Sequence, residues 1–189
     1  MARTPTTSIP LGFQAPDFSI PEPLTDKVVT LNEVQGTHAT LVMFICNHCP
    51  FVVHVMDELV RLGRDYTLPE VGMVAISSND VMNYPQDAPD LMAELARLKS
   101  MPFPYLYDES QEVAKAYDAA CTPDFSVFDA QGKCVYRGQL DGSRPGNDVP
   151  VTGVDIREVL DTLVSGGQVP REGQRPSLGC NIKWKENAI

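Results

Sequence analysis

Residues 44–52 read FICNHCPFV and place two cysteines, Cys46 and Cys49, at the end of an apolar run. The run, HATLVMFIC (residues 38–46), is continuous, as in a strand that is buried on both faces of a sheet. After Pro50, apolar side chains recur at intervals of three and four residues, which predicts a helix. The sequence therefore predicts a strand that ends at Cys46, a helix that begins near Pro50, and two thiols between them.

Two thiols at a helix N-terminus can act as a redox pair. The unpaired N–H groups and the helix dipole favour negative charge there, which lowers the pKa of a cysteine from about 8.5 to about 7 or less. Pro50 suits the first helical turn because it needs no N–H donor. We expect Cys46 to be the more exposed, attacking thiol and Cys49 the resolving thiol. His48 can donate to the thiolate, which favours the dithiol and predicts an oxidising couple.

Two other interpretations of the pair remain open, namely part of a metal site and two buried hydrophobic thiols. A structural zinc site needs a second ligand pair at compact spacing, and the other cysteines are scattered. They are Cys121, Cys134 and Cys180. The nearby imidazoles are those of His48 and His54, and we expect His54 on a solvated face of the helix.

Length and charge limit the possible functions. The chain has 189 residues and a net charge of -10, which argues against nucleic-acid binding. We expect one domain over residues 1–189, with an N-terminal extension at about 1–37 and a C-terminal tail at about 166–189. No signal peptide or membrane span is recognisable, so we expect a cytoplasmic protein without a membrane partner. In that compartment a close cysteine pair is more often catalytic or metal-binding than structural.

The rest of the chain alternates between strand and helix patterns. Residues 10–37 predict two short edge strands, and the tail reads as irregular and basic. Asp87 and Pro89 are typical of a helix opening. Further strands are expected at residues 71–78, 103–108, 124–130 and 133–141, and further helices at 87–100, 109–118 and 155–164. This order predicts an α/β fold with a central mixed β-sheet flanked by helices.

Six segments together resemble the thioredoxin-like superfamily, and within it the redoxin-type thiol–disulfide oxidoreductases and isomerases with a CNHCP motif. The segments are GFQAPDFSI (12–20), FICNHCPFV (44–52), VAISSND (74–80), FPYLYDESQEVAKAYDAACTPDFSVFD (103–129), YRGQLDGSRP (136–145) and SLGCNIKWK (177–185). The resemblance implies a thioredoxin fold with no organic cofactor beyond a redox-active disulfide. It also implies that the Thr122-Pro123 peptide is cis, faces the thiols and keeps metal away from them. Thr122, with Asn47 and Pro50, would then bind the substrate backbone.

Two positions, Thr40 and Ile45, depart from the thioredoxin pattern, and a third, Arg137, is a candidate anion-binding residue. Thr40 replaces a buried acid, so a proton leaving Cys49 needs another base or water. Ile45 replaces an aromatic residue that would form a flat docking surface. Arg137 could bind an anion near the site, although we expect a surface arginine on a strand.

A peroxidase mechanism is disfavoured by the residues before the cysteines. The redoxin-type proteins are also described as peroxiredoxin-like. In peroxiredoxins a proline lies seven residues before the reactive cysteine and a threonine lies three residues before it. The matching residues are Ala39 and Met43 for Cys46, and Val42 and Cys46 for Cys49.

The remaining cysteines are candidate accessory thiols. Cys121 precedes Pro123 by two residues and is either a third thiol near the pair or, as we favour, a small buried hydrophobe. Cys134 is expected to be structural. Lysines near Cys180 would favour its thiolate, and the tail could fold back so that Cys180 exchanges with Cys46 or Cys121. The alternative is that Trp184 anchors the tail and Cys180 only packs.

The sequence thus predicts a thiol–disulfide oxidoreductase. Its substrate would be a protein or low-molecular-weight disulfide, and its electrons would come from a partner reductase. The alternatives are a thiol peroxidase, a metal- or copper-binding redox module, and a redox-sensing interaction protein without turnover. No feature of the sequence defines the oligomeric state.

Overall fold

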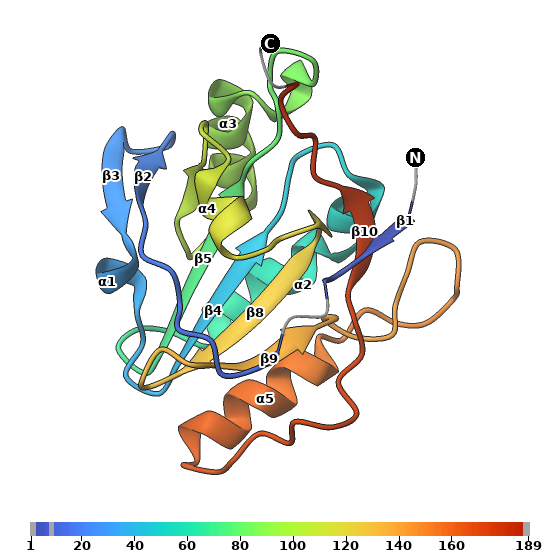
Figure 1. The fold of residues 1–189 in the computed structure, drawn as a ribbon. Helices are drawn as coiled ribbons and strands as arrows, with labels where there is room; N and C mark the ends of the chain where they lie inside the picture. Colours follow the sequence, from blue (N-terminus) through green and yellow to red (C-terminus); the bar gives the residue numbers. More distant parts are fainter. Residues whose placement is uncertain (1–2, 8–9, 187–189) are drawn as a thin grey trace.

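A five-stranded mixed sheet lies at the centre of the structure, a computed structural model that describes residues 3–7 and 10–186 (Figure 1). The outermost residues of the predicted extension and tail lie outside these ranges. The strand order is β6-β5-β4-β8-β9, in which β4, β5 and β6 are parallel and β8 is antiparallel to both β4 and β9. The strands are β4 (Ala39–Phe44), β5 (Val71–Ser77), β6 (Tyr105–Tyr107), β8 (Asp124–Asp129) and β9 (Cys134–Gly138). The predicted α/β class with a central mixed sheet is confirmed.

Both faces of the sheet are covered, which explains why β4 is apolar throughout. Leu41 and Met43 pack in one cluster with side chains of three helices, whereas Val42 and Phe44 pack in a second cluster on the other face. The first face is covered by α2 (Pro50–Asp65), α3 (Pro89–Lys99) and α5 (Val154–Val164). The second is covered by α1 (Leu31–Val34), α4 (Glu112–Ala116) and the hairpin of β2 (Ser19–Glu22) and β3 (Lys27–Thr30).

A second, three-stranded sheet forms beside the first, and the sequence did not predict it. It has the order β1-β10-β7, with the bounds β1 (Arg3–Pro5), β7 (Cys121–Thr122) and β10 (Leu178–Asn181), and Figure 1 shows β10 next to β1 at the right of the molecule. The prediction of an irregular tail was therefore wrong over β10. This strand has little periodicity of its own and exists because Thr4 pairs with Gly179 and Cys180 pairs with Thr122.

The helix after β5 begins at Pro89, a proline that the sequence places at the helix start, but two residues later than the predicted bound at residue 87. A 3-10 turn, η1 (Pro85–Asp87), precedes α3, and the residue that caps α3 is Ala88. Asp87 therefore does not cap α3, and its side chain is directed at the CNHC segment. Within the described ranges, no helix is long and apolar enough to cross a bilayer.

Candidate active site

The two cysteines of the CNHC segment lie between β4 and α2. The N–H of Ile45 donates to the carbonyl oxygen of Ile76 at 3.0 Å, which continues the pairing of β4 with β5 up to Cys46. Cys49 is the N-cap residue of α2, and the exposed Pro50 is its first residue. This arrangement matches the strand and helix that the sequence predicts around the pair.

Both thiols are buried, although Cys46 was expected to be clearly the more exposed of the two. Cys46 is 1% exposed and Cys49 0%. Thr122 covers both, since its Oγ1 lies 3.5 Å from Cys46 Sγ and its carbonyl oxygen 3.1 Å from Cys49 Sγ. The Thr122-Pro123 peptide bond that follows is cis. The backbone of Thr122 in turn pairs with Cys180 of β10, so the edge expected to receive a substrate is occupied by the chain itself.

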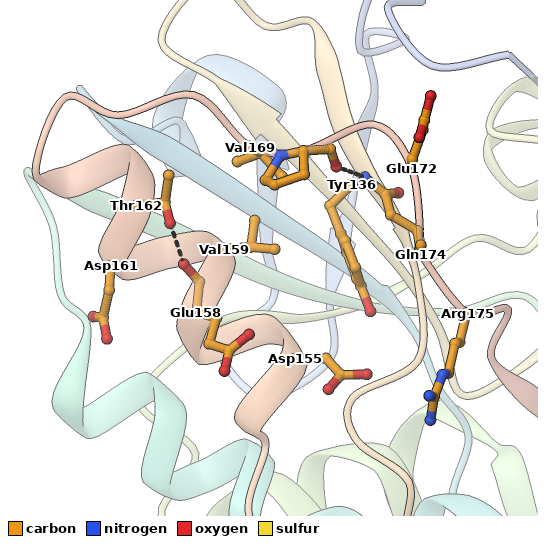
Figure 2. A pocket seen from close by; sticks show the side chains of 12 residues that line it. Tyr136, Asp155, Glu158, Val159, Asp161, Thr162, Val169, Glu172, Gln174 and Arg175 are labelled. Atoms are coloured by element: carbon orange, nitrogen blue, oxygen red, sulfur yellow. Dashed lines mark hydrogen bonds between the residues drawn. The ribbon is translucent and has the colours of Figure 1, made fainter.

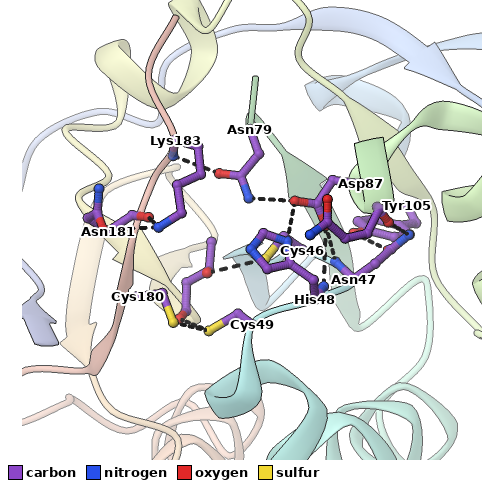
Figure 3. Close-up of polar contacts among 12 residues, drawn as sticks. Cys46, Asn47, His48, Cys49, Asn79, Asp87, Tyr105, Cys180, Asn181 and Lys183 are labelled. Atoms are coloured by element: carbon purple, nitrogen blue, oxygen red, sulfur yellow. Dashed lines mark hydrogen bonds and ion pairs between the residues drawn. The ribbon is translucent and has the colours of Figure 1, made fainter. Parts of the chain in front are cut away.

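A third thiol, that of Cys180, lies at the pair. Its Sγ is 2.9 Å from Cys49 Sγ (Figure 3). The tail does fold back, but the sulfur that Cys180 contacts is that of Cys49 rather than Cys46 or Cys121. Trp184 is 42% exposed, so it is not the anchor of the tail, whereas Ile182 is buried.

The hydrogen bonds among the thiols decide which of them carries charge. Hydrogen bonds with Cys46 and, to a smaller extent, with Cys180 lower the pKa of Cys49, although burial opposes this shift. The hydrogen bond with Cys49, burial and the carboxylate of Asp87 raise the pKa of Cys46. Burial and the bond to Cys49 raise the pKa of Cys180 to about 12, so the predicted effect of the nearby lysines is outweighed. These directions favour negative charge on Cys49 over Cys46 and Cys180.

Asp87 holds the loop between the cysteines, and the sequence did not single it out as a site residue. Its buried carboxylate accepts from Nδ1 of His48 at 2.7 Å and from the backbone N–H groups of Asn47 and His48 at 2.8 and 3.3 Å. The side chain of Asn79 also donates to it, at 2.8 Å (Figure 3). The ring of Tyr84 stacks on that of His48 with centroids 5.7 Å apart. His48 is thereby fixed in orientation beside the pair.

Asn47 is also engaged with the protein itself. Its side-chain oxygen accepts from the hydroxyl of Tyr105 at 3.0 Å, and its amide donates to the carbonyl oxygen of Gln86 at 3.1 Å. These bonds tie the redox loop to β6 and η1. A substrate-binding role for Asn47 stays a prediction.

Cys121 and Cys134 are both buried. Within the described part of the chain, their side-chain hydrogen bonds go to backbone carbonyl oxygens and not to another sulfur, unlike that of Cys180. Cys121 Sγ lies 3.5 Å from the carbonyl oxygen of Pro123, and Cys134 Sγ 3.4 Å from that of Tyr136. Burial raises the pKa of both thiols, which reaches about 12 for Cys134. These contacts fit the structural interpretation that the sequence favours for each.

Two side chains expected at the surface are instead held by the fold. Arg137 is buried, and it donates to the carbonyl oxygens of Thr7, Tyr117 and Asp118 at 2.6 to 3.2 Å. Its guanidinium satisfies the hydrogen-bonding capacity of these backbone oxygens and does not serve the thiols. His54 is half-buried, and its Nε2 lies 2.7 Å from the hydroxyl of Ser143. Neither position could be inferred from local sequence, because both depend on segments distant along the chain.

One group of side chains has the composition of a metal site. Ligand atoms of Cys46, His48 and Asp87 lie within 4.8 Å of one another. The sequence suggested Cys46 and Cys49 with His48 or His54 as ligands, whereas the structure brings Asp87 to Cys46 and His48. The chemistry of this set, one thiolate, one imidazole and one carboxylate, suits a divalent transition metal.

One cavity lies away from the cysteines. Its volume is about 700 Å³, and it lies between α5 and residues 169–175 (Figure 2). The side chains of Asp155, Glu158 and Arg175 are among those that surround it. No residue predicted for the redox site lines it.

Comparison with known proteins identifies the class to which this fold and site belong. The chain matches the Redoxin family over residues 10–155, and it belongs to that family. The resemblance to thioredoxin-like redoxins is thereby confirmed. A search of the curated proteins found no match.

Two solved structures are similar to this chain over nearly the whole length of both chains. An uncharacterized conserved protein from Geobacillus kaustophilus is 57% identical, with a TM-score of 0.96 over 100% of this chain and 99% of that one. A hypothetical protein from Sinorhizobium meliloti 1021 is 43% identical, with a TM-score of 0.94 over 97% and 100%. A thiol:disulfide interchange protein of the thioredoxin family from Chlorobium tepidum TLS is 15% identical, with a TM-score of 0.63 over 83% and 99%, and shares the fold.

Proposed function

We propose that this protein is a thiol–disulfide oxidoreductase in which Cys46 attacks a substrate disulfide and Cys49 resolves the product. The observation that carries the proposal is the position of Cys46 and Cys49 at the N-terminus of α2, where both sulfurs contact Thr122 and the pKa of Cys49 is lowered. A thiolate is the form of cysteine that attacks disulfides. Membership in the Redoxin family and the thioredoxin-like fold support a redox role.

The first step transfers one proton within the pair. As the sulfur of Cys46 attacks the substrate disulfide, its proton passes along the hydrogen bond to the thiolate of Cys49, and the first substrate sulfur leaves as a thiolate. Cys49 then attacks the sulfur of Cys46, the second substrate sulfur leaves, and the proton of Cys49 passes to a leaving thiolate. The substrate disulfide is reduced to one thiol and one thiolate, the thiolate takes up a proton from water, and the protein gains the Cys46–Cys49 disulfide.

Asp87 and His48 act as positioning residues in this scheme. The backbone N–H groups of Asn47 and His48 donate to Asp87, which fixes the CNHC loop between the cysteines. His48, whose Nδ1 bonds to the same carboxylate, is held close to Cys46. No base is needed at Thr40, because the proton moves between the sulfurs themselves. The near-complete burial of Cys46 means that a substrate reaches it only when its cover moves.

The substrate would be a protein or a low-molecular-weight disulfide, and a partner reductase would regenerate the dithiol. An extended protein substrate that docks on Thr122 would have to displace β10, which already pairs with it. A small disulfide such as glutathione disulfide needs a smaller opening. We therefore expect the small disulfide to react first.

A count of alkylatable thiols across a series of glutathione redox buffers tests the proposal. We expect a single transition that removes two thiols, with peptide mapping that links Cys46 to Cys49. Turnover of glutathione disulfide with a dithiol donor should be lost in the double variant Cys46→Ser/Cys49→Ser and kept in Cys134→Ser. If the wild-type protein loses no alkylatable thiols in any of the redox buffers, the oxidoreductase role is refuted.

A metal-binding redox module is the second candidate, favoured by the cluster of Cys46, His48 and Asp87. A metal would have to displace the bond between His48 and Asp87, which is 2.7 Å long. Retention of one equivalent of zinc or copper after dialysis, lost in both Cys46→Ser and His48→Gln, would favour this candidate. A protein that retains no metal and oxidises readily to the disulfide would exclude it.

A further inference from the structure

We propose that Cys180 is a third redox thiol, which accepts a disulfide bond to Cys49 and thereby releases Cys46 as a lone reactive thiol. The proposal rests on the proposed function for the step that first oxidises Cys46 and Cys49. The strand β10, which carries Cys180, would then take part in the redox chemistry as well as in the fold.

The contact between the sulfurs is the main observation. Cys49 and Cys180 are 131 residues apart in sequence, yet their Sγ atoms lie 2.9 Å from each other (Figure 3). Both residues are buried, so solvent does not compete for either sulfur. Thiol–disulfide exchange requires a sulfur to approach a disulfide sulfur directly, and here the approach is already made in the dithiol.

The strand that carries Cys180 is held at this place by bonds on both sides of the residue. Cys180 pairs with Thr122, the hydroxyl of Ser177 donates to the carbonyl oxygen of Pro123 at 2.6 Å, and the N–H of Ile182 donates to that of Ala120 at 3.1 Å. The backbone of Gly179 lies so close to Thr122 that a Cβ there would meet its carbonyl oxygen at 2.0 Å. Cys180 is therefore presented to Cys49 by a fitted strand and not by a loose tail.

A fixed position suits Cys180 for exchange with the oxidised pair. The sulfur of Cys180 attacks Cys49 in the Cys46–Cys49 disulfide, the bond between Cys46 and Cys49 breaks, and a bond between Cys49 and Cys180 forms. Cys46 leaves as a thiolate and takes up the proton that Cys180 gives up. One disulfide replaces another, so the step needs no further oxidant or reductant.

This exchange changes what the site does to a substrate. With Cys49 bound to Cys180, Cys46 can still attack a disulfide, but no resolving thiol of this protein can complete the reduction. The mixed disulfide is then resolved by another thiol of the substrate, which rearranges its disulfides without net reduction. Burial raises the pKa of Cys180, so the exchange should become faster as pH rises.

The test is a map of disulfides formed by the full chain. The reduced protein is treated with one equivalent of glutathione disulfide or diamide, quenched with acid, alkylated and digested, and linked peptides are quantified. We expect the wild type to give Cys49–Cys180 together with Cys46–Cys49. Cys46→Ser and Cys46→Ala should each lose two alkylatable thiols and give Cys49–Cys180 alone.

Cys134→Ala is the matched control, because Cys134 is equally buried and its thiol pKa is also raised to about 12, but it contacts no sulfur of the site among the described bonds. This variant should give the wild-type map. Absence of the Cys49–Cys180 peptide from the wild type and both Cys46 variants would overturn the inference. If Cys180→Ala then still forms Cys46–Cys49, the proposed function stands; if Cys180→Ala forms no such bond, the proposed function fails as well.

Discussion

Asp87 shows how one buried carboxylate organises the site. It is fully buried, and it accepts hydrogen bonds from two side chains and from two backbone N–H groups of the CNHC loop. Buried charges that are fully hydrogen-bonded stabilise a single arrangement, because removing one partner leaves the others unsatisfied. The same carboxylate opposes negative charge on Cys46, so it helps to place the thiolate on Cys49.

Replacement of Asp87 by asparagine removes this charge at nearly constant volume. We expect the pKa of Cys46 to fall, because the carboxylate raises it in addition to the hydrogen bond with Cys49 and burial. A more acidic dithiol is stabilised relative to the disulfide, so the potential of the pair should rise by roughly 30 mV, the equivalent of about 1.4 kcal/mol. Glutathione redox titration with thiol counting measures it.

The control for this substitution is Asp90→Asn, since Asp90 is exposed in the first turn of α3. Its potential should equal that of the wild type. An Asp87→Asn potential that is unchanged or lower would contradict the role given to the carboxylate.

Among the elements, β10 has the greatest effect on access to the thiols. It pairs with β7, contacts α2 and carries Cys180, so it closes the side of the site at which Thr122 would otherwise be free to pair. The side of β7 that pairs with β10 has no free backbone groups for another strand. Opening of this strand is therefore the expected route of access for an extended substrate.

Gly179→Ala should open the site. The new Cβ would lie 2.0 Å from the carbonyl oxygen of Thr122, a backbone atom that cannot move without breaking the pairing. We expect β10 to detach and the alkylation rates of Cys46 and Cys49 in the folded protein to rise about tenfold or more, because local opening controls the reaction of buried groups. Timed alkylation with mass spectrometry measures the rates.

Gly142→Ala is the matched control, because the nearest atom to its Cβ would be 3.9 Å away. In Gly142→Ala, Cys46 and Cys49 should be alkylated at the same rates as in the wild type. Equal rates for Gly179→Ala and the wild type would show that β10 does not limit access.

A buried ion pair joins α2 to α5. Glu58 is buried and accepts from Nη2 and Nε of Arg157 at 2.7 and 2.9 Å. Glu58→Gln should lower the free energy of unfolding by about 1.5 to 3 kcal/mol, because the bonds to a charged partner are weakened in a site with little water. Urea denaturation measures this change.

The neighbouring residue provides the comparison. Asp57 is exposed and pairs with Lys99 at 2.7 Å. Asp57→Asn should cost less than about 1 kcal/mol, since water screens an exposed pair. Equal losses for the two variants would contradict the importance of burial at Glu58.

At the scale of the whole molecule, burial of thiols makes stability depend on pH. The pKa of each of four thiols, those of Cys46, Cys121, Cys134 and Cys180, is raised in the folded protein. In the unfolded chain they lose their protons near about pH 8.5. Above that pH the unfolded state binds fewer protons than the folded state, so the free energy of unfolding falls as pH rises toward the folded pKa values.

Cys134 allows this dependence to be measured apart from the redox site. Burial raises its pKa to about 12, so its contribution is complete below about pH 8.5 and is lost between there and about pH 12. In Cys134→Ala, the fall of the free energy of unfolding above about pH 8.5 should be shallower by about 1.4 kcal/mol per pH unit. Urea denaturation of the reduced protein checks this. Parallel pH dependences for the two proteins would contradict it.

The sequence by itself determined the elements whose signals are local. The apolar run before Cys46 and the helical spacing after Pro50 predict β4 and α2, because burial on two faces and an amphipathic helix leave a pattern within a dozen residues. The same patterns predict β5, α5 and the hairpin of β8 and β9. The two cysteines follow from these elements, since a strand–helix junction fixes where they lie.

Only the tertiary structure decided what surrounds the cysteines. Asp87 reaches His48 across 39 residues, and Cys180 reaches Cys49 across 131. Arg137 is buried because three carbonyl oxygens from other segments meet at its guanidinium. Contacts of this kind come from the packing of distant segments, which leaves no period in the sequence around either partner, and β10 owes its existence to the same pairing.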